Sequence, residues 1–161
     1  MNPRLKKRLL VALLIALYVA AGFYREFIFG NINEQIRVTY DTVYRHQPTY
    51  SYVAPSMQWL SGYSYYTLYY SKWVLTLFTA FFFAFLATRI IKNAFTDKGL
   101  IRITWLAYAF VFVVGWLFYL GGALSGNIGS TYDIARFLAG LTETPVLLLV
   151  LCASFLAIGR R

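Results

Sequence analysis

Charged residues are scarce in this sequence. Only 13% of its 161 residues are Asp, Glu, Lys or Arg, and 60% are apolar, whereas a soluble domain carries about 25% charged residues. A soluble fold of this length has no core large enough to hide several apolar runs that approach the ~20 residues needed to cross hydrocarbon as a helix. The composition therefore predicts a single domain embedded in a lipid bilayer.

Cysteine and histidine are almost absent, since the chain has only Cys152 and His46. One cysteine excludes an intramolecular disulfide and a cysteine metal cluster. One histidine, expected on a loop, leaves a Ser-His-Asp set, a bis-histidine haem and a histidine zinc site without support. The Gly-Asn-Ile-Gly-Ser sequence at 126–130 predicts a turn, because a phosphate loop requires a strand before it and a lysine after it. We therefore predict no enzyme activity, no metal site and no cofactor.

Long apolar runs are what the chain does have. Each run predicts a membrane helix, because in lipid every backbone N–H and C=O must find its partner within the segment. The fold class expected is all-α, a polytopic membrane protein with four transmembrane helices. The predicted crossings are residues 9–24, 73–91, 103–124 and 134–158.

The fourth crossing is interrupted by polar residues and by Pro145. Two forms are possible. In the first, Thr144 caps a shorter spanning helix with Pro145 at its first position, and residues 133–141 form a separate interfacial helix. In the second, the helix is continuous and kinked at Pro145. We favour a crossing over residues 134–158 that is kinked or broken near Pro145, because the stretch after Thr144 alone barely spans a bilayer.

The formal charge of +9 reflects cations at the ends of the apolar runs. Ten lie on one side of the predicted membrane: Arg4, Lys6, Lys7, Arg8, Arg89, Lys92, Lys98, Arg102, Arg160 and Arg161. Five lie on the other side, in a longer stretch of chain: Arg25, Arg37, Arg45, Lys72 and Arg136. The positive-inside rule then predicts that both termini are cytoplasmic, in a multi-pass protein of the inner (plasma) membrane. Cations distributed in this way predict no nucleic-acid partner.

Residues 25–72 are expected to form a tyrosine-rich segment on the outer side. Ten of the fourteen tyrosines lie in or next to it, and the predicted aromatic surface is Tyr63, Tyr65, Tyr66, Tyr69 and Tyr70. The simplest explanation is an aromatic belt at the headgroups; the alternative is a surface for a partner protein, lipid or glycan. Apolar residues from Ile32 to Tyr44 at spacings of three and four, with Asn31 and Glu34 as a capping pair, predict a short amphipathic helix along the membrane surface.

Six charged residues should fall near the outer edge of the bilayer: Arg25, Glu26, Lys72, Asp133, Arg136 and Glu143. Asp133, Arg136 and Glu143 share one helical face at spacings of three and seven, and this face is expected to turn inward. Buried charges are costly unless paired or hydrated. The set therefore predicts either an interhelical ionic lock or an outward-facing pocket for a lipid headgroup, a peptide or a partner helix.

Four short sequences carry a resemblance. They are Arg-Glu-Phe at 25–27, Asn-Ile-Asn at 31–33, Tyr-Tyr-Ser-Lys-Trp at 69–73, and Ala-Arg-Phe-Leu at 135–138 before Pro145. In this order they resemble a group of small four-helix membrane proteins of Bacteroidota, some of them associated with exosortase sorting systems. The resemblance implies an accessory role in envelope protein sorting or export and nothing catalytic.

The leading hypothesis is a non-enzymatic accessory subunit of an inner-membrane assembly that binds a membrane protein through its outer tyrosine-rich segment. Membrane lipids are the other expected partners. The competing hypothesis is a small lipid-handling or transport protein that uses the charge cluster. A membrane enzyme ranks last, since it would depend on Glu143, Asp133 or His46 as its base.

Overall fold

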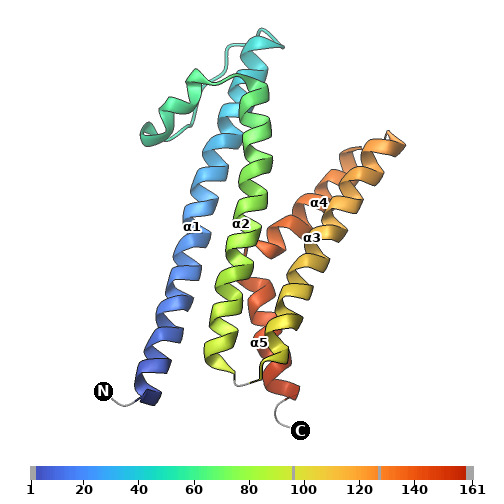
Figure 1. Cartoon of the computed structure of the whole chain (residues 1–161). Helices are drawn as coiled ribbons and strands as arrows, with labels where there is room; N and C mark the ends of the chain where they lie inside the picture. Colours follow the sequence, from blue (N-terminus) through green and yellow to red (C-terminus); the bar gives the residue numbers. More distant parts are fainter. Residues whose placement is uncertain (1–2, 96, 127, 159–161) are drawn as a thin grey trace. The chain divides into compact units, whose positions relative to one another are not determined.

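Every regular element of the computed structural model is helical in the residues it describes, 3–95, 97–126 and 128–158 (Figure 1). The elements are α1 (Pro3–Val43), the 3-10 helix η1 (Pro55–Gly62), α2 (Tyr65–Ala94), α3 (Gly99–Ser125), α4 (Ile128–Thr142) and α5 (Pro145–Ile158). The all-α prediction is therefore confirmed for these residues. Arg160 and Arg161, which contributed to the orientation count, lie outside them.

Three helices, α1, α2 and α3, are long and apolar enough to cross a membrane. The pair α4 and α5 meets the same criterion only when taken together, and its two halves are bent by 61° at a short break. The chain thus has three candidate spans, or four if this pair is one broken span. The prediction of a membrane protein is confirmed at this level.

Helix α1 does not end where the sequence predicted. It is one helix of 41 residues, about twice the length that hydrocarbon requires. The prediction of a separate amphipathic helix from Ile32 to Tyr44 along the membrane surface is therefore wrong, because residues 32–43 continue the first helix. Asn31 does not start a new helix, since its Nδ2 donates to the Phe27 carbonyl one turn earlier at 2.7 Å.

Helix α2 begins eight residues earlier than predicted, at Tyr65 instead of residue 73. Tyr65, Tyr66, Tyr69 and Tyr70, which the sequence predicts in a connection, thus lie in its first two turns. Ser64 caps this start, because its Oγ accepts the Thr67 N–H at 3.2 Å. The predicted outer segment, residues 25–72, is consequently helical at both ends, with η1 in the middle.

The chain divides into two compact units that share α1 and α2: residues 23–78 form one, and residues 1–22 with 79–161 form the other. The smaller unit contains the end of α1, η1 and the start of α2, and in Figure 1 η1 projects to the side of these two helices. Its core is Ile32, Leu60 and Leu68, one residue from each element, with Met57 and Leu75 packed against them. Three elements therefore hold residues 23–78 together.

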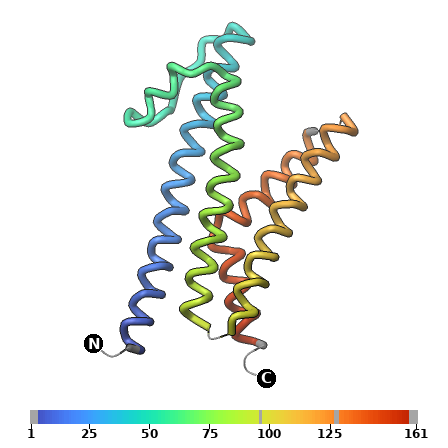
Figure 2. Tube along the Cα trace, viewed as in Figure 1, coloured from blue at the N-terminus to red at the C-terminus, as the bar shows by residue number. Residues whose placement is uncertain are grey.

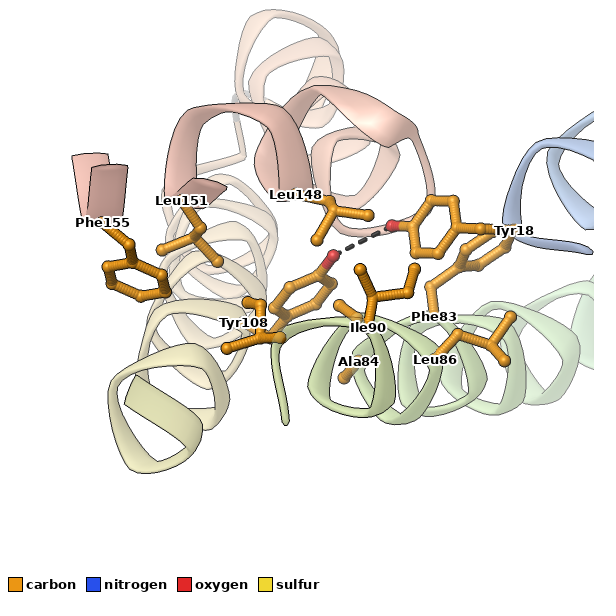
Figure 3. Packing of buried hydrophobic residues seen from close by; sticks show 11 residues of the cluster. Tyr18, Phe83, Ala84, Leu86, Ile90, Tyr108, Leu148, Leu151 and Phe155 are labelled. Atoms are coloured by element: carbon orange, nitrogen blue, oxygen red, sulfur yellow. Dashed lines mark hydrogen bonds between the residues drawn. The ribbon is translucent and has the colours of Figure 1, made fainter. Parts of the chain in front are cut away.

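The larger unit has its own core, drawn in Figure 3. Tyr18 of α1 packs edge-on against Phe83 of α2, with 4.8 Å between ring centroids. Tyr108 of α3 and Leu148 of α5 complete the contact. The residues of this core come from α1, α2, α3 and α5. The core therefore packs α5, which follows the helix break, against three other helices.

Helices α3 and α4 lie side by side (Figure 1). A Cβ at Gly115 would lie 3.3 Å from the Leu138 Cβ and 3.4 Å from the Ala135 carbonyl oxygen. Gly115 and Gly122 are both buried in this contact region of α3. Small residues let two membrane helices approach closely and gain dispersion contacts in the absence of a hydrophobic driving force.

The break between α4 and α5 follows from Pro145, which starts α5 and has no N–H to offer the Leu141 carbonyl. The Thr144 hydroxyl donates to that carbonyl instead, at 3.4 Å. The trace changes direction here (Figure 2). Helix α5 has 14 residues, about 21 Å at 1.5 Å per residue, which is shorter than the ~30 Å of hydrocarbon. A crossing in this region therefore needs α4 as well, and otherwise the pair is a re-entrant loop.

Candidate functional site

The tyrosine-rich segment is ordered by a hydrogen-bond ladder within the smaller unit. The Ala54 N–H donates to Asn31 Oδ1 at 2.6 Å, and the Tyr52 N–H donates to Glu34 Oε1 at 3.1 Å. Arg37 Nη2 donates to the Tyr50 carbonyl at 3.1 Å. The three residues of α1 are spaced three apart in the sequence, and the three loop residues that they contact are spaced two apart. An extended strand of loop therefore runs along one face of α1, and we call these three contacts the backbone ladder.

The backbone ladder leaves the side chains of the loop facing out. Tyr50 is 86% exposed and Tyr52 is 81% exposed. Between η1 and the first turns of α2, large aromatic side chains are also exposed: Trp59, Tyr63, Tyr66 and Tyr70. We call these six residues the tyrosine surface.

Contacts with neighbouring rings support part of the tyrosine surface. Tyr40, Tyr44 and Tyr65 contact one another with centroid distances of 5.5 to 5.7 Å. Tyr65 also stacks on Tyr69 at 6.1 Å and meets Tyr66 edge-on at 5.4 Å. Ring pairs of this kind contribute about 0.5–1.5 kcal/mol each beyond the area they bury. The predicted aromatic residues are thus divided: Tyr65 and Tyr69 build the support, whereas Tyr63, Tyr66 and Tyr70 present their rings.

Charge is nearly absent from this surface. Residues 47–71 contain no Asp, Glu, Lys or Arg, and they include seven tyrosines, five serines and two threonines. The charges of the neighbouring helix alternate in sign and pair along it, from Glu34 to Arg37 at 2.6 Å and then to Asp41 at 3.5 Å. Antigen-binding loops use the same combination of rigid tyrosine rings with small hydroxyl residues.

The larger unit holds a polar centre that the sequence did not predict. Tyr18 OH donates to the Thr144 carbonyl at 3.1 Å and shares a hydrogen bond of 2.9 Å with Tyr108 OH (Figure 3). Next to Thr144, Glu143 is 1% exposed, and Thr79 Oγ1 donates to its Oε1 at 2.6 Å. Two sets of hydrogen bonds thus bring residues of α1, α2 and α3 to neighbouring residues at the break between α4 and α5, and we call them together the polar centre.

One signal in the sequence could have pointed to the polar centre. Tyr18 and Tyr108 lie in the middle of apolar runs, away from the interfaces where tyrosine is usually found. A phenol in an apolar environment needs a hydrogen-bond partner. The partner is a carbonyl 126 residues away, and no spacing in the sequence reveals it.

The structure divides the six predicted charged residues between the two units. Arg25 and Glu26 form an adjacent ion pair at 2.5 Å in the smaller unit, where Arg25 also lies over the Phe29 ring. Lys72 belongs to the same unit. Asp133, Arg136 and Glu143 belong to the larger unit. The single ionic cluster therefore stays a prediction.

The inward face predicted for Asp133, Arg136 and Glu143 is wrong in part. Asp133 and Arg136 are exposed in the structure, and only Glu143 is buried. The physical reason is that α4 ends at Thr142, so the helical spacing does not extend to Glu143. The Glu143 N–H closes a tighter turn to the Gly140 carbonyl at 3.1 Å.

His46 and Cys152 lie in different parts of the structure. His46 ends the turn after α1 with a φ of 54°, a backbone conformation in which histidine is tolerated better than most residues. Cys152 is half-buried on α5 and packs against the core of the larger unit. Among the described residues, no group of three His, Cys, Asp or Glu side chains could hold a metal ion.

No family model, no curated protein and no solved structure matches this chain. What the fold and the site define is therefore a class only: a helical membrane protein with three to four candidate spans.

Proposed function

We propose that this protein is a non-enzymatic accessory subunit of an inner-membrane assembly and that its tyrosine surface binds a partner membrane protein. The tyrosine surface carries this proposal, because six large rings are exposed on a segment that the backbone ladder orders. An ordered surface binds with a smaller loss of conformational entropy than a flexible one. Aromatic side chains, tyrosine and tryptophan above all, dominate the energetics of protein interfaces.

The proposal includes a topology of four crossings with both termini in the cytoplasm, which puts the tyrosine surface outside. The distribution of cations supports this orientation. Together with the resemblance described above, it suggests a role in envelope protein sorting or export.

The test is a comparison of complexes purified in mild detergent from native membranes. Trp59→Ser combined with Tyr66→Ser should remove a partner that copurifies in stoichiometric amount with the unaltered chain. The control is Phe110→Ser combined with Leu124→Ser, which changes two apolar residues of α3 that are more exposed than Trp59 and Tyr66. The control should retain the partner. Equal loss from both variants, or an unaltered chain that purifies as a monomer, contradicts the proposal.

A lipid-handling or transport function is a second candidate, favoured by one observation. Glu143 is a buried carboxyl group at a helix break within a candidate span, and ionisable groups in membrane helices often mark a substrate or ion path. Glu143→Gln keeps the size of the side chain and removes the charge. Loss of folded protein would support a structural lock, whereas a folded variant that no longer copurifies with a defined lipid would support this second function.

A further inference from the structure

The larger unit carries a dense group of exposed cations at one end of its core. Eight lysines and arginines are exposed there, and we call them the basic collar. They are Arg4, Lys6, Lys7 and Arg8 at the start of α1, Arg89 and Lys92 near the end of α2, and Lys98 and Arg102 around the start of α3. The three helix ends belong to one compact unit.

In each of the three helices, the cations of the basic collar are close in sequence to residues of the core of this unit. Arg8 is three residues from Val11, and Arg89 and Lys92 flank Ile90 and Ile91. Leu100 lies between Lys98 and Arg102. Val11, Ile90, Ile91 and Leu100 all belong to the same core or pack directly on it. The cations therefore surround the point where the apolar core ends.

Acidic residues are almost absent from the segments of this unit that carry the basic collar. Residues 1–22 and 79–125 contain a single acidic residue, Asp97. Asp97 Oδ1 accepts the Gly99 N–H at 2.7 Å, so it serves as a cap for α3. The cations at the starts of α1 and α3 are unfavourably placed relative to the helix dipole, so helix stability gives no reason for their position.

Arg89 shows how the basic collar meets its surroundings. Its guanidinium lies over the exposed Phe85 ring, 4.8 Å from the ring centroid. The ring can remain in the acyl chains while the charge reaches the headgroups, as long cationic side chains do near helix ends. An apolar surface thus lies directly beside a cation. A phospholipid, which has both acyl chains and a charged headgroup, fits this arrangement better than a soluble anion does.

We propose that the basic collar binds the phosphate headgroups of anionic phospholipids and that this binding stabilises the fold of the larger unit. The proposal is independent of the partner suggested for the tyrosine surface. It also goes beyond an orientation signal, which acts during insertion and leaves the purified protein indifferent to the charge of the headgroup. Basic residues next to a membrane helix each favour an anionic surface by about fivefold in affinity.

The test uses the purified full-length chain in detergent and two lipids with identical acyl chains, phosphatidylglycerol and phosphatidylcholine. The thermal unfolding midpoint is followed as each lipid is added. Phosphatidylglycerol should raise the midpoint at a much lower concentration than phosphatidylcholine. Salt should weaken this preference, because exposed charges are screened.

The variant that tests the site is Lys7→Gln combined with Lys98→Gln. The concentration of phosphatidylglycerol needed for half of the effect should rise by about fivefold for each cation removed. The control, Arg45→Gln, removes one exposed cation outside the basic collar and should behave as the unaltered chain. If the first variant is unstable in phosphatidylcholine, Lys6→Gln combined with Arg102→Gln replaces it.

Three results overturn the proposal. The two lipids could act at the same concentration, or the collar and control variants could shift equally. In the third, a short RNA duplex at equal phosphate concentration raises the midpoint as much as phosphatidylglycerol does, which would make the basic collar a general polyanion surface.

Discussion

At the scale of single residues, Tyr18 connects the break between α4 and α5 to two other helices. Its hydroxyl contacts both the Thr144 carbonyl and Tyr108 OH. A buried polar group that loses its partner costs about 1–3 kcal/mol, whereas an intact intramolecular hydrogen bond contributes only about 1 kcal/mol net. The destabilisation caused by removing a tyrosine hydroxyl from the polar centre therefore depends on how many buried groups lose their hydrogen-bond partner.

Tyr18→Phe should lower the free energy of unfolding by about 1–3 kcal/mol, because Tyr108 OH and the Thr144 carbonyl both lose their partner. Tyr108→Phe should cost about 1 kcal/mol or less, since Tyr18 OH keeps the carbonyl. Chemical unfolding in detergent measures both. The double variant should cost less than the sum of the two, as expected for residues in one network; strict additivity would contradict the shared hydrogen bond.

Asn31 anchors the loop of the tyrosine surface, and its replacement tests the backbone ladder. Asn31→Leu should leave the Ala54 N–H without its acceptor and expose residues 50–54, so hydrogen exchange at Ala54 should become at least tenfold faster. Asn93→Leu is the matched control. Asn93 makes the same contact with its own helix, 2.7 Å from Nδ2 to the Arg89 carbonyl, and should leave exchange at Ala54 unchanged.

At the scale of elements, the contact between α3 and α4 depends on Gly115. Gly115→Leu should destabilise the protein by about 1–3 kcal/mol, because the side chain meets Leu138 and the backbone of α4. Thermal unfolding in detergent measures the loss. Gly121→Leu in the same helix is the control, since a Cβ there has nothing within 4 Å. Equal effects of the two substitutions would show that α3 and α4 do not pack at Gly115.

The elements also show why the capping pattern of Asn31 and Glu34 does not start a new helix. Asn31 and Glu34 have the spacing of a capping box, and both side chains do accept backbone N–H groups. The groups belong to Ala54 and Tyr52 of the following loop rather than to the start of a new helix. Local sequence does not distinguish a donor three residues away from one 18 residues away.

At the scale of the whole molecule, orientation in the membrane can be tested with single cysteines. In a chain with Cys152→Ser, a Tyr52→Cys substitution should react with an impermeant thiol reagent added outside intact cells, because the exposed Tyr52 is predicted outside. Lys98→Cys should react only after the membrane is permeabilised. Both side chains are exposed in the structure, so burial does not explain a difference. The reverse labelling pattern would overturn the predicted topology.

The sequence by itself determined the class of this protein and the place of its helix break. Apolar runs of sufficient length admit only helices in lipid, and Pro145 cannot continue a helix that needs its N–H. Both constraints are local, so residue order is enough to predict them. The tertiary structure decided the length of α1, the backbone ladder beneath the tyrosine surface and the partners of Tyr18 and Glu143. The backbone ladder and the contacts of Tyr18 and Glu143 depend on hydrogen bonds between groups 13 to 126 residues apart, and only folding brings such groups together.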